Sequence, residues 1–290
     1  MNSGVSRRGV LGAMVAGAAW GHAARWSGAA TAEEFQPLKG RINHSVCRWC
    51  YGRIPLEELC AFCKKLGIKS VELLGPKDWP VVKQFGLTCA MVSSGTRIER
   101  GFNRLEHHDE LIAHYERMIP QVAEAGFKNL ICFSGNRQGL DDEQGMKNCA
   151  VGIKRLLPLC EKHDVVLVME LLNSKVDHKD YMCDRTAWGV ELCKMIGSER
   201  FKLLYDIYHM QIMEGDLIRT IRANIEYIAH FHTGGNPGRN EIDETQEIYY
   251  PAVMRAIADT GYTGYVGHEF VPKSPDPLKS LERCARICEV

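Results

Sequence analysis

Four residues of metal-ligand type come at the ends of four separate apolar runs in the second half of the chain: Glu170, Asp206, His232 and Glu269. Any one carboxylate in such a place can cap a helix or pair with a lysine or arginine. Brought together, three anions and an imidazole would repel one another or stay unsatisfied without a cation. The oxygen-rich set suits Mn²⁺, Mg²⁺ or Co²⁺, with Zn²⁺ also possible, so the sequence predicts one bound divalent metal ion.

A recurring pattern marks the elements that would carry these residues: a helical stripe ends at glycine, and an apolar run follows. The pattern is seen at Gly67, Gly126, Gly197 and Gly261. Glycine adopts the left-handed conformation that closes a helix, and near-continuous apolar runs are typical of parallel strands covered on both faces. With the gaps filled, strands are predicted at 42–47, 70–74, 88–92, 129–134, 165–170, 201–206, 227–233 and 265–270.

Segments with helical periodicity lie between the predicted strands. Pro158 is expected to interrupt one of them. The alternation of strands and helices over about 250 residues favours a closed (β/α)8 TIM barrel. An open doubly wound sheet usually has a glycine-rich phosphate loop after its first strand, and none occurs here. The clearest helical stripe, with the spacing of one helix face, consists of Leu111, Ile112, Tyr115, Met118, Ile119 and Val122.

The first 32 residues are predicted to be a twin-arginine export signal. Ser6-Arg7-Arg8 leads into a weakly polar run from Gly9 to Trp20 and then into Ala30-Thr31-Ala32. This run is short for a membrane span, so a membrane anchor is the weaker interpretation. Residues 33–290 are expected to form a single catalytic barrel domain that is exported to the periplasm and is not stably inserted in the membrane.

The charge composition indicates a small-molecule partner. The chain has 36 basic and 36 acidic residues and a pI near 7.1, which gives no electrostatic reason to expect nucleic acid as a partner. A homo-oligomer is compatible with this composition.

Twelve cysteines are many for an exported protein. Core packing explains them best, because two of the close pairs continue helical apolar stripes, while disulfides and a structural zinc site stay open as alternatives. The close pairs are Cys47/Cys50, Cys60/Cys63 and Cys284/Cys288.

Three motifs resemble the hydroxypyruvate isomerase family, one of the xylose-isomerase-like barrels. The resemblance covers essentially the whole chain after the export signal and is strongest from Glu170 to Phe270. The ordered ligand set is specific to this superfamily, which also includes ketose 3-epimerases, rather than to one substrate. The motifs are Tyr205-Asp206-Ile207-Tyr208-His209-Met210-Gln211, Asn236-Pro237-Gly238-Arg239 and Gly267-His268-Glu269.

The resemblance implies a role for each candidate site residue. Glu170, Asp206, His232 and Glu269 would hold the metal, and Glu170 and Glu269 would also face the substrate carbon as an acid/base pair. His209 and Arg239 would contact substrate oxygens, a task that suits the planar guanidinium. Asn173, three residues after Glu170, is a further candidate for substrate contact.

The chemistry agrees with these roles. Moving a proton between adjacent carbons that bear a carbonyl and a hydroxyl passes through an ene-diolate, whose negative charge a metal can hold. Such a reaction needs no organic cofactor. The leading hypothesis is isomerisation of hydroxypyruvate or a related small keto acid or sugar.

A ketose 3-epimerase is the nearest alternative, because hydroxypyruvate isomerases commonly have glutamine where His232 stands. A non-catalytic sugar-binding barrel is a further alternative. An abasic-site endonuclease would need more metal ligands and a basic groove, and the neutral charge argues against it.

Several other residues are weaker candidates. His44 and Glu72 lie near the ends of the first two predicted strands, where each could line the pocket, cap a helix or be a paired group at the surface. His107 and His108 precede a strong amphipathic helix, which favours a solvated face over a ligand role. Trp49 and Tyr51 could form an apolar wall of the pocket, although two aromatics after a first strand more often cover the barrel.

Overall fold

The predicted apolar runs form a curved parallel sheet. The computed structural model describes residues 35–290, so the predicted export signal at residues 1–32 lies outside the described residues. Gln36–Val290 forms one compact unit. Its strands pair in the order β2-β1-β7-β6-β5-β4-β3. They are β1 (Asn43–Cys47), β2 (Ser70–Glu72), β3 (Asn129–Cys132), β4 (Val166–Glu170), β5 (Phe201–Asp206), β6 (Ile228–Thr233) and β7 (Tyr265–His268).

The strand predicted at 88–92 is reduced to single bridges. Thr88 bridges to Ser70, and Val92 bridges to both Leu74 and Leu130, so this segment joins the two edges of the sheet and closes the barrel. The ladder is interrupted at Ala90, whose N–H donates to the Ser70 hydroxyl at 2.9 Å and whose carbonyl accepts from the Asn129 side chain at 3.0 Å. Side chains therefore replace the backbone partners that a regular strand would use.

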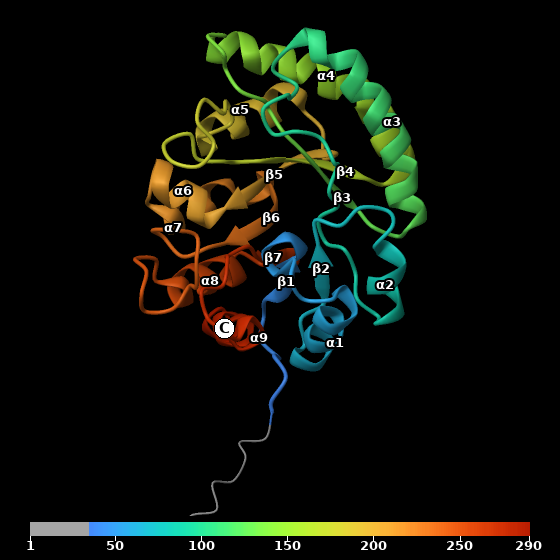
Figure 1. Cartoon of the computed structure of the whole chain (residues 1–290). Coiled ribbons are helices and arrows are strands. Elements are labelled where there is room, and N and C mark those ends of the chain that lie inside the picture. Colours follow the sequence, from blue (N-terminus) through green and yellow to red (C-terminus); the bar gives the residue numbers. More distant parts are fainter. Residues whose placement is uncertain (1–34) are drawn as a thin grey trace, which may run out of the picture. The chain divides into compact units, whose positions relative to one another are not determined.

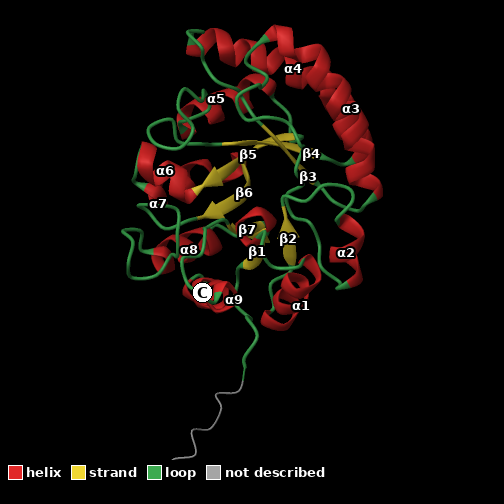
Figure 2. Cartoon of the chain, in the orientation of Figure 1, coloured by secondary structure: helices red, strands yellow, loops and turns green. Residues whose placement is uncertain are grey.

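Helices surround the strands, as Figures 1 and 2 show. This is the arrangement of a (β/α)8 barrel, in which each parallel strand is covered by the helix that follows it. The helices are α1 (Leu56–Leu66), α2 (Trp79–Gln84), α3 (His108–Glu124), α4 (Asp142–His163), α5 (Thr186–Ile196), α6 (Ile207–Met213), α7 (Leu217–Asn224), α8 (Tyr250–Asp259) and α9 (Pro277–Ile287), with short 3-10 turns at Arg48–Tyr51, Leu105–His107 and Ile225–Tyr227.

The structure confirms the predicted helical stripe and corrects one prediction about a proline. All six residues of the predicted stripe on α3 are buried. Pro158, however, lies inside α4 and does not interrupt it. The carbonyl that loses its hydrogen-bond partner to this proline belongs to Lys154, which is exposed, so water can solvate it.

The cysteines pack in the core, as the helical stripes predicted. All twelve are free thiols, and each is buried except Cys50, which is half-buried. Among residues 35–290, no helix combines the length and apolar character needed to cross a membrane.

Candidate active site

The four predicted metal ligands meet at the carboxyl ends of four adjacent strands. Glu170 and Asp206 end β4 and β5, and Asp206 is paired in register with His232 of β6. Glu269 comes directly after β7, and its N–H still donates to the Thr233 carbonyl at 3.0 Å. One ligand atom from each of the four side chains lies within 4.8 Å of the others.

These atoms lie close together, but most of them make no hydrogen bond. His232 Nδ1 lies 3.3 Å from Glu170 Oε1 and 2.9 Å from Glu269 Oε2. Nevertheless, Glu170 Oε1, Asp206 Oδ2 and His232 Nδ1 are buried and have no hydrogen-bond partner among the described residues. Buried polar atoms are rarely left in that state. Unpaired oxygen and nitrogen atoms that face one point fit the ligand set of a divalent cation.

Burial and mutual repulsion disturb the protonation of this cluster. Burial raises the pKa of Glu170, and it raises the pKa of Asp206 to about 8. Burial also acts to raise the pKa of Glu269, but His232 and Arg239 outweigh it and hold that pKa well below its ordinary value. The three carboxyl groups therefore differ in how readily each gives up its proton.

A carboxylate in the barrel interior is within hydrogen-bond distance of the second ring nitrogen of His232. Glu72 Oε1 lies 2.7 Å from His232 Nε2 and 2.8 Å from His230 Nε2, and all three side chains are fully buried. Burial alone would raise the pKa of Glu72, but the charge and hydrogen bonds of the two histidines lower it strongly. Glu72 thus accepts from Nε2 of His232 and leaves Nδ1 free to face the cluster.

Gly267 leaves space for the contact between Glu72 and His232. It pairs in register with His232 across β6 and β7. A Cβ atom at this position would lie 2.4 Å from Glu72 Oε1 and 2.8 Å from His232 Cδ2. Only glycine leaves space for the Glu72 carboxylate beside the ring.

Arg239 and Trp49 border the cluster on its open side. Arg239 Nη2 donates to Glu269 Oε2 at 2.6 Å and lies 3.5 Å from Asp206 Oδ2. The indole N–H of Trp49 donates to Glu269 Oε1 at 2.7 Å. The guanidinium also lies over the rings of Trp49 and Tyr208, at 5.3 and 5.6 Å from their centroids. Arg239 Nε is buried and has no hydrogen-bond partner among the described residues.

The other two predicted substrate contacts form a chain beside Asp206. The backbone N–H of His209 donates to Asp206 Oδ1 at 2.9 Å, and its ring Nδ1 lies 2.6 Å from Asn173 Nδ2. His209 Nε2 has no hydrogen-bond partner among the described residues. Burial and the nearby Arg239 charge lower the pKa of His209 well below its ordinary value. Asn173 is fully buried and contacts the His209 ring.

A cavity of about 400 Å³ opens over the cluster. Glu170, Glu269 and Arg239 form its polar side, whereas Trp49 and Phe133 belong to its apolar wall. An apolar enclosure with a few converging polar groups is the common form of a small-molecule site.

Sequence reasoning underestimated three residues. Trp49 lines the cavity, as one of its two expected roles predicted, and its indole N–H also contacts a predicted acid/base residue, which was not expected. Glu72 could have been found from the spacing of His230 and His232, because residues two apart on a strand share one face and two inward histidines need an acceptor. His108 is buried and bonds to the Phe102 carbonyl at 2.8 Å, so the expectation of a solvated face was wrong for it.

His44 does not line the cavity. Its ring Nδ1 lies 3.1 Å from His268, and its Nε2 lies 3.0 Å from Glu289. His44 is thus paired, but it is buried rather than at the surface as the paired alternative expected.

The fold and the strand-end cluster define a xylose-isomerase-like barrel, and comparison with known proteins agrees. The sequence model described as "Xylose isomerase-like TIM barrel" matches residues 60–287, and the chain belongs to this family. The hydroxypyruvate isomerase of Escherichia coli (strain K12) is 31% identical over 150 residues, which are 51% of this chain and 57% of that protein. The 2-oxo-tetronate isomerase of Cupriavidus necator is 33% identical over 110 residues, which are 38% of this chain and 42% of that protein. The matches thus span about half of the length of these relatives.

Solved structures show the same fold. A family 2 AP endonuclease from Brucella melitensis superposes with a TM-score of 0.75 at 22% identity, covering 84% of this chain and 99% of that one. A D-psicose 3-epimerase superposes with a TM-score of 0.70 at 17% identity, covering 85% of this chain and 96% of that one. At such identities the likeness concerns the fold alone, and the predicted barrel is confirmed.

Proposed function

We propose that the protein is a metal-dependent isomerase that acts on hydroxypyruvate or a related small keto acid or sugar. The observation that carries the proposal is the convergence of Glu170 Oε1, Asp206 Oδ2 and His232 Nδ1, all buried and without hydrogen-bond partners in the described chain. The names of the sequence relatives, hydroxypyruvate isomerase and 2-oxo-tetronate isomerase, support the same class of reaction.

Glu170, Asp206, His232 and Glu269 would hold the metal. When bound, a divalent cation supplies positive charge next to the substrate oxygen on which negative charge develops. The donors that remain free for the substrate are Arg239 Nε and His209 Nε2.

The two glutamates have different environments, which suggests how they share the proton transfer. Burial raises the pKa of Glu170, whereas His232 and Arg239 overcome burial and lower the pKa of Glu269. Such opposed shifts are typical of acid/base pairs. Glu269 would remove the proton from the substrate carbon, and Glu170 would deliver a proton to the neighbouring carbon. The intermediate between these steps is an ene-diolate.

A ketose 3-epimerase is the second candidate, and one residue favours it. His232 stands where hydroxypyruvate isomerases commonly have glutamine and epimerases commonly have histidine. The same pair of glutamates would then remove and return the proton at one carbon from opposite faces.

Deuterium incorporation tests these candidates. The Mn²⁺-loaded protein is incubated in deuterated water with hydroxypyruvate, 2-oxo-tetronate, D-fructose and D-psicose, and the exchange is followed by proton NMR. Exchange in the keto acids supports the isomerase, and exchange in the ketoses alone supports the epimerase. Glu170→Gln and Glu269→Gln are expected to abolish exchange, while Glu199→Gln, at an exposed position, retains it. Absence of exchange in the whole panel, with metal bound, would refute the proposal in favour of a binding protein.

A further inference from the structure

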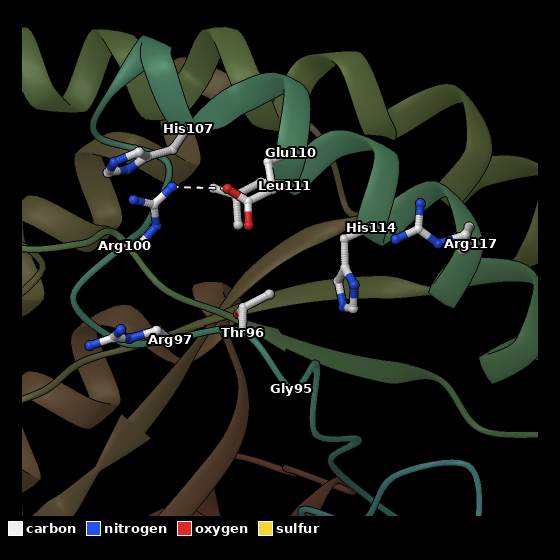
Figure 3. A pocket seen from close by; sticks show the side chains of 9 residues that line it. All are labelled: Gly95, Thr96, Arg97, Arg100, His107, Glu110, Leu111, His114 and Arg117. Carbon is white, nitrogen blue, oxygen red and sulfur yellow. Dashed lines mark hydrogen bonds and ion pairs between the residues drawn. The ribbon is translucent and has the colours of Figure 1, made fainter.

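A second cavity lies between the segment 95–100 and the start of α3 (Figure 3). Its volume is about 220 Å³. Glu110 is the only carboxylate among the described residues that line it, and the chain as a whole carries equal numbers of acidic and basic residues. Arginine and histidine side chains are therefore concentrated at this cavity and do not reflect a basic chain as a whole. These side chains are Arg97, Arg100, His107, His114 and Arg117.

Both histidines are held in place by backbone carbonyls. His114 Nε2 lies 2.6 Å from the Ser94 carbonyl, and His107 Nδ1 lies 3.3 Å from the Gly101 carbonyl. Because a carbonyl only accepts, these nitrogens are the donors, and the other nitrogen of each neutral ring is an acceptor, so the histidines shape the cavity while the arginines supply its N–H donors. Figure 3 shows His114 extending from α3 toward the segment that carries Thr96. The cavity thus has fixed walls.

The arginines have replaceable partners or none. Arg100 pairs with Glu110 at 2.9 Å and Arg97 with Glu99 at 3.5 Å, and these arginine side chains are 49% and 75% exposed. Exposed pairs of this kind contribute only about 0–1 kcal/mol. Arg117 has no ion-pair partner within residues 35–290. A phosphate group, which accepts paired N–H bonds from guanidinium, competes well with such partners.

The cavity shares a wall with the candidate active site. Thr96 lines both cavities. Ser94 lines the larger one, and its carbonyl fixes His114 in the smaller one. The two hydroxyls lie 2.8 Å apart. A group bound among the arginines would therefore contact the wall of the cavity that contains Glu170 and Glu269.

We propose that this cavity is an anion site for a phosphate group, either free or as the monoester of a small molecule. The volume holds roughly seven waters at ~30 Å³ each, which is room for a phosphate group. If the ligand is a phosphate monoester, the part of the molecule beyond the phosphate would lie outside the cavity or along its wall at Thr96. This site is separate from the metal cluster, so it stands or falls independently of the proposed isomerase.

Calorimetric titration of the metal-loaded full-length chain tests the site. Inorganic phosphate, D-fructose 6-phosphate and D-fructose are titrated at constant ionic strength set with chloride. Saturable binding of a phosphate compound is expected. Any binding of D-fructose, which belongs to the substrate panel of the larger cavity, is expected to be unchanged by the arginine substitutions below. Tighter binding of the sugar phosphate identifies the ester as the source, and tighter binding of inorganic phosphate identifies the free anion.

Substitutions locate the binding. Arg100→Gln and Arg117→Gln are each expected to weaken phosphate binding about tenfold, the effect of losing a hydrogen bond to a charged group. Arg219→Gln is the matched control, because this arginine is 85% exposed and pairs only locally with Asp216 at 3.2 Å. Thermal unfolding verifies that each variant is folded. Unchanged affinity in both folded variants would place phosphate elsewhere and overturn the proposal, as would the absence of saturable binding to the wild-type chain.

Discussion

At the scale of single residues, His232 organises the site through its two ring nitrogens. Nδ1 faces Glu170 and Glu269, while Nε2 is bound by the buried Glu72. A hydrogen bond to one ring nitrogen fixes the orientation of the ring and the tautomer that presents the other. Glu72 is therefore a positioning residue for the proposed metal site.

Replacing Glu72 tests this positioning. Glu72→Gln keeps the shape of the side chain but loses the charge that accepts from both histidines, so the affinity for Mn²⁺ is expected to fall about 10- to 100-fold. A competition titration against a chromogenic chelator measures it. Glu289→Gln serves as control, because Glu289 contacts a different histidine, His44, at 3.0 Å. Equal affinity in the wild type and Glu72→Gln would contradict the role.

Proton release on metal binding follows from the protonation of the cluster. Burial raises the pKa of Asp206 to about 8. Burial lowers the pKa of His232, but Cys47 and Glu269 more than reverse this and raise it well above its ordinary value. At pH 7 both groups are expected to hold a proton that coordination removes, so metal affinity should rise as the pH increases toward 8. Calorimetry in Hepes and in Tris would give different apparent enthalpies, and identical enthalpies would rule out the release.

At the scale of elements, the register between β6 and β7 decides whether the barrel can hold the cluster. His232 pairs with Gly267, and the missing side chain of Gly267 is the space that Glu72 occupies. A shift by one residue would turn His232 out of the interior and bring a side chain to this position. The glycine and the histidine pair are thus parts of the same arrangement.

An alanine at position 267 probes this arrangement. Gly267→Ala is expected to lower the free energy of unfolding by about 1–3 kcal/mol, as overpacking of a core does, and to weaken metal binding by displacing Glu72. Gly75→Ala is the control, since a Cβ there would meet nothing within 4 Å. Denaturant titrations of the metal-free proteins measure the stability. Similar losses in both variants would show that the contact with Glu72 does not matter.

Element prediction from the sequence succeeded where apolar runs were long and failed where side chains replaced backbone partners. The run ending at Asp206 is a full strand, whereas 88–92 makes only isolated bridges, because Ser70 and Asn129 bind the backbone of Ala90. Periodicity cannot reveal such side-chain bonds. The positions of the candidate ligands were predictable because strand ends share one edge. The spacing of His230 and His232 indicates that an acceptor is needed, but that Glu72 of β2 supplies it depends on a contact across the barrel.

At the scale of the whole molecule, the thiols are enclosed by the closed barrel and its helices. Burial raises the pKa of Cys63, Cys132 and Cys183 well above the ordinary value, which keeps them unreactive. The native protein is expected to expose at most the half-buried Cys50 to a thiol reagent such as DTNB, and the denatured protein all twelve. Rapid reaction of several thiols in the native protein would contradict the described packing.

Because the folded protein encloses its thiols, it matters whether the chain folds before or after it meets an oxidant. A copy that completes its barrel before it meets an oxidant carries its cysteines in the reduced form into any later environment. A copy that meets the oxidant as an extended polymer has twelve thiols available for random cross-links, any of which would trap it short of the native state. Recovery from denaturant is therefore expected to require a reductant, although the finished fold does not.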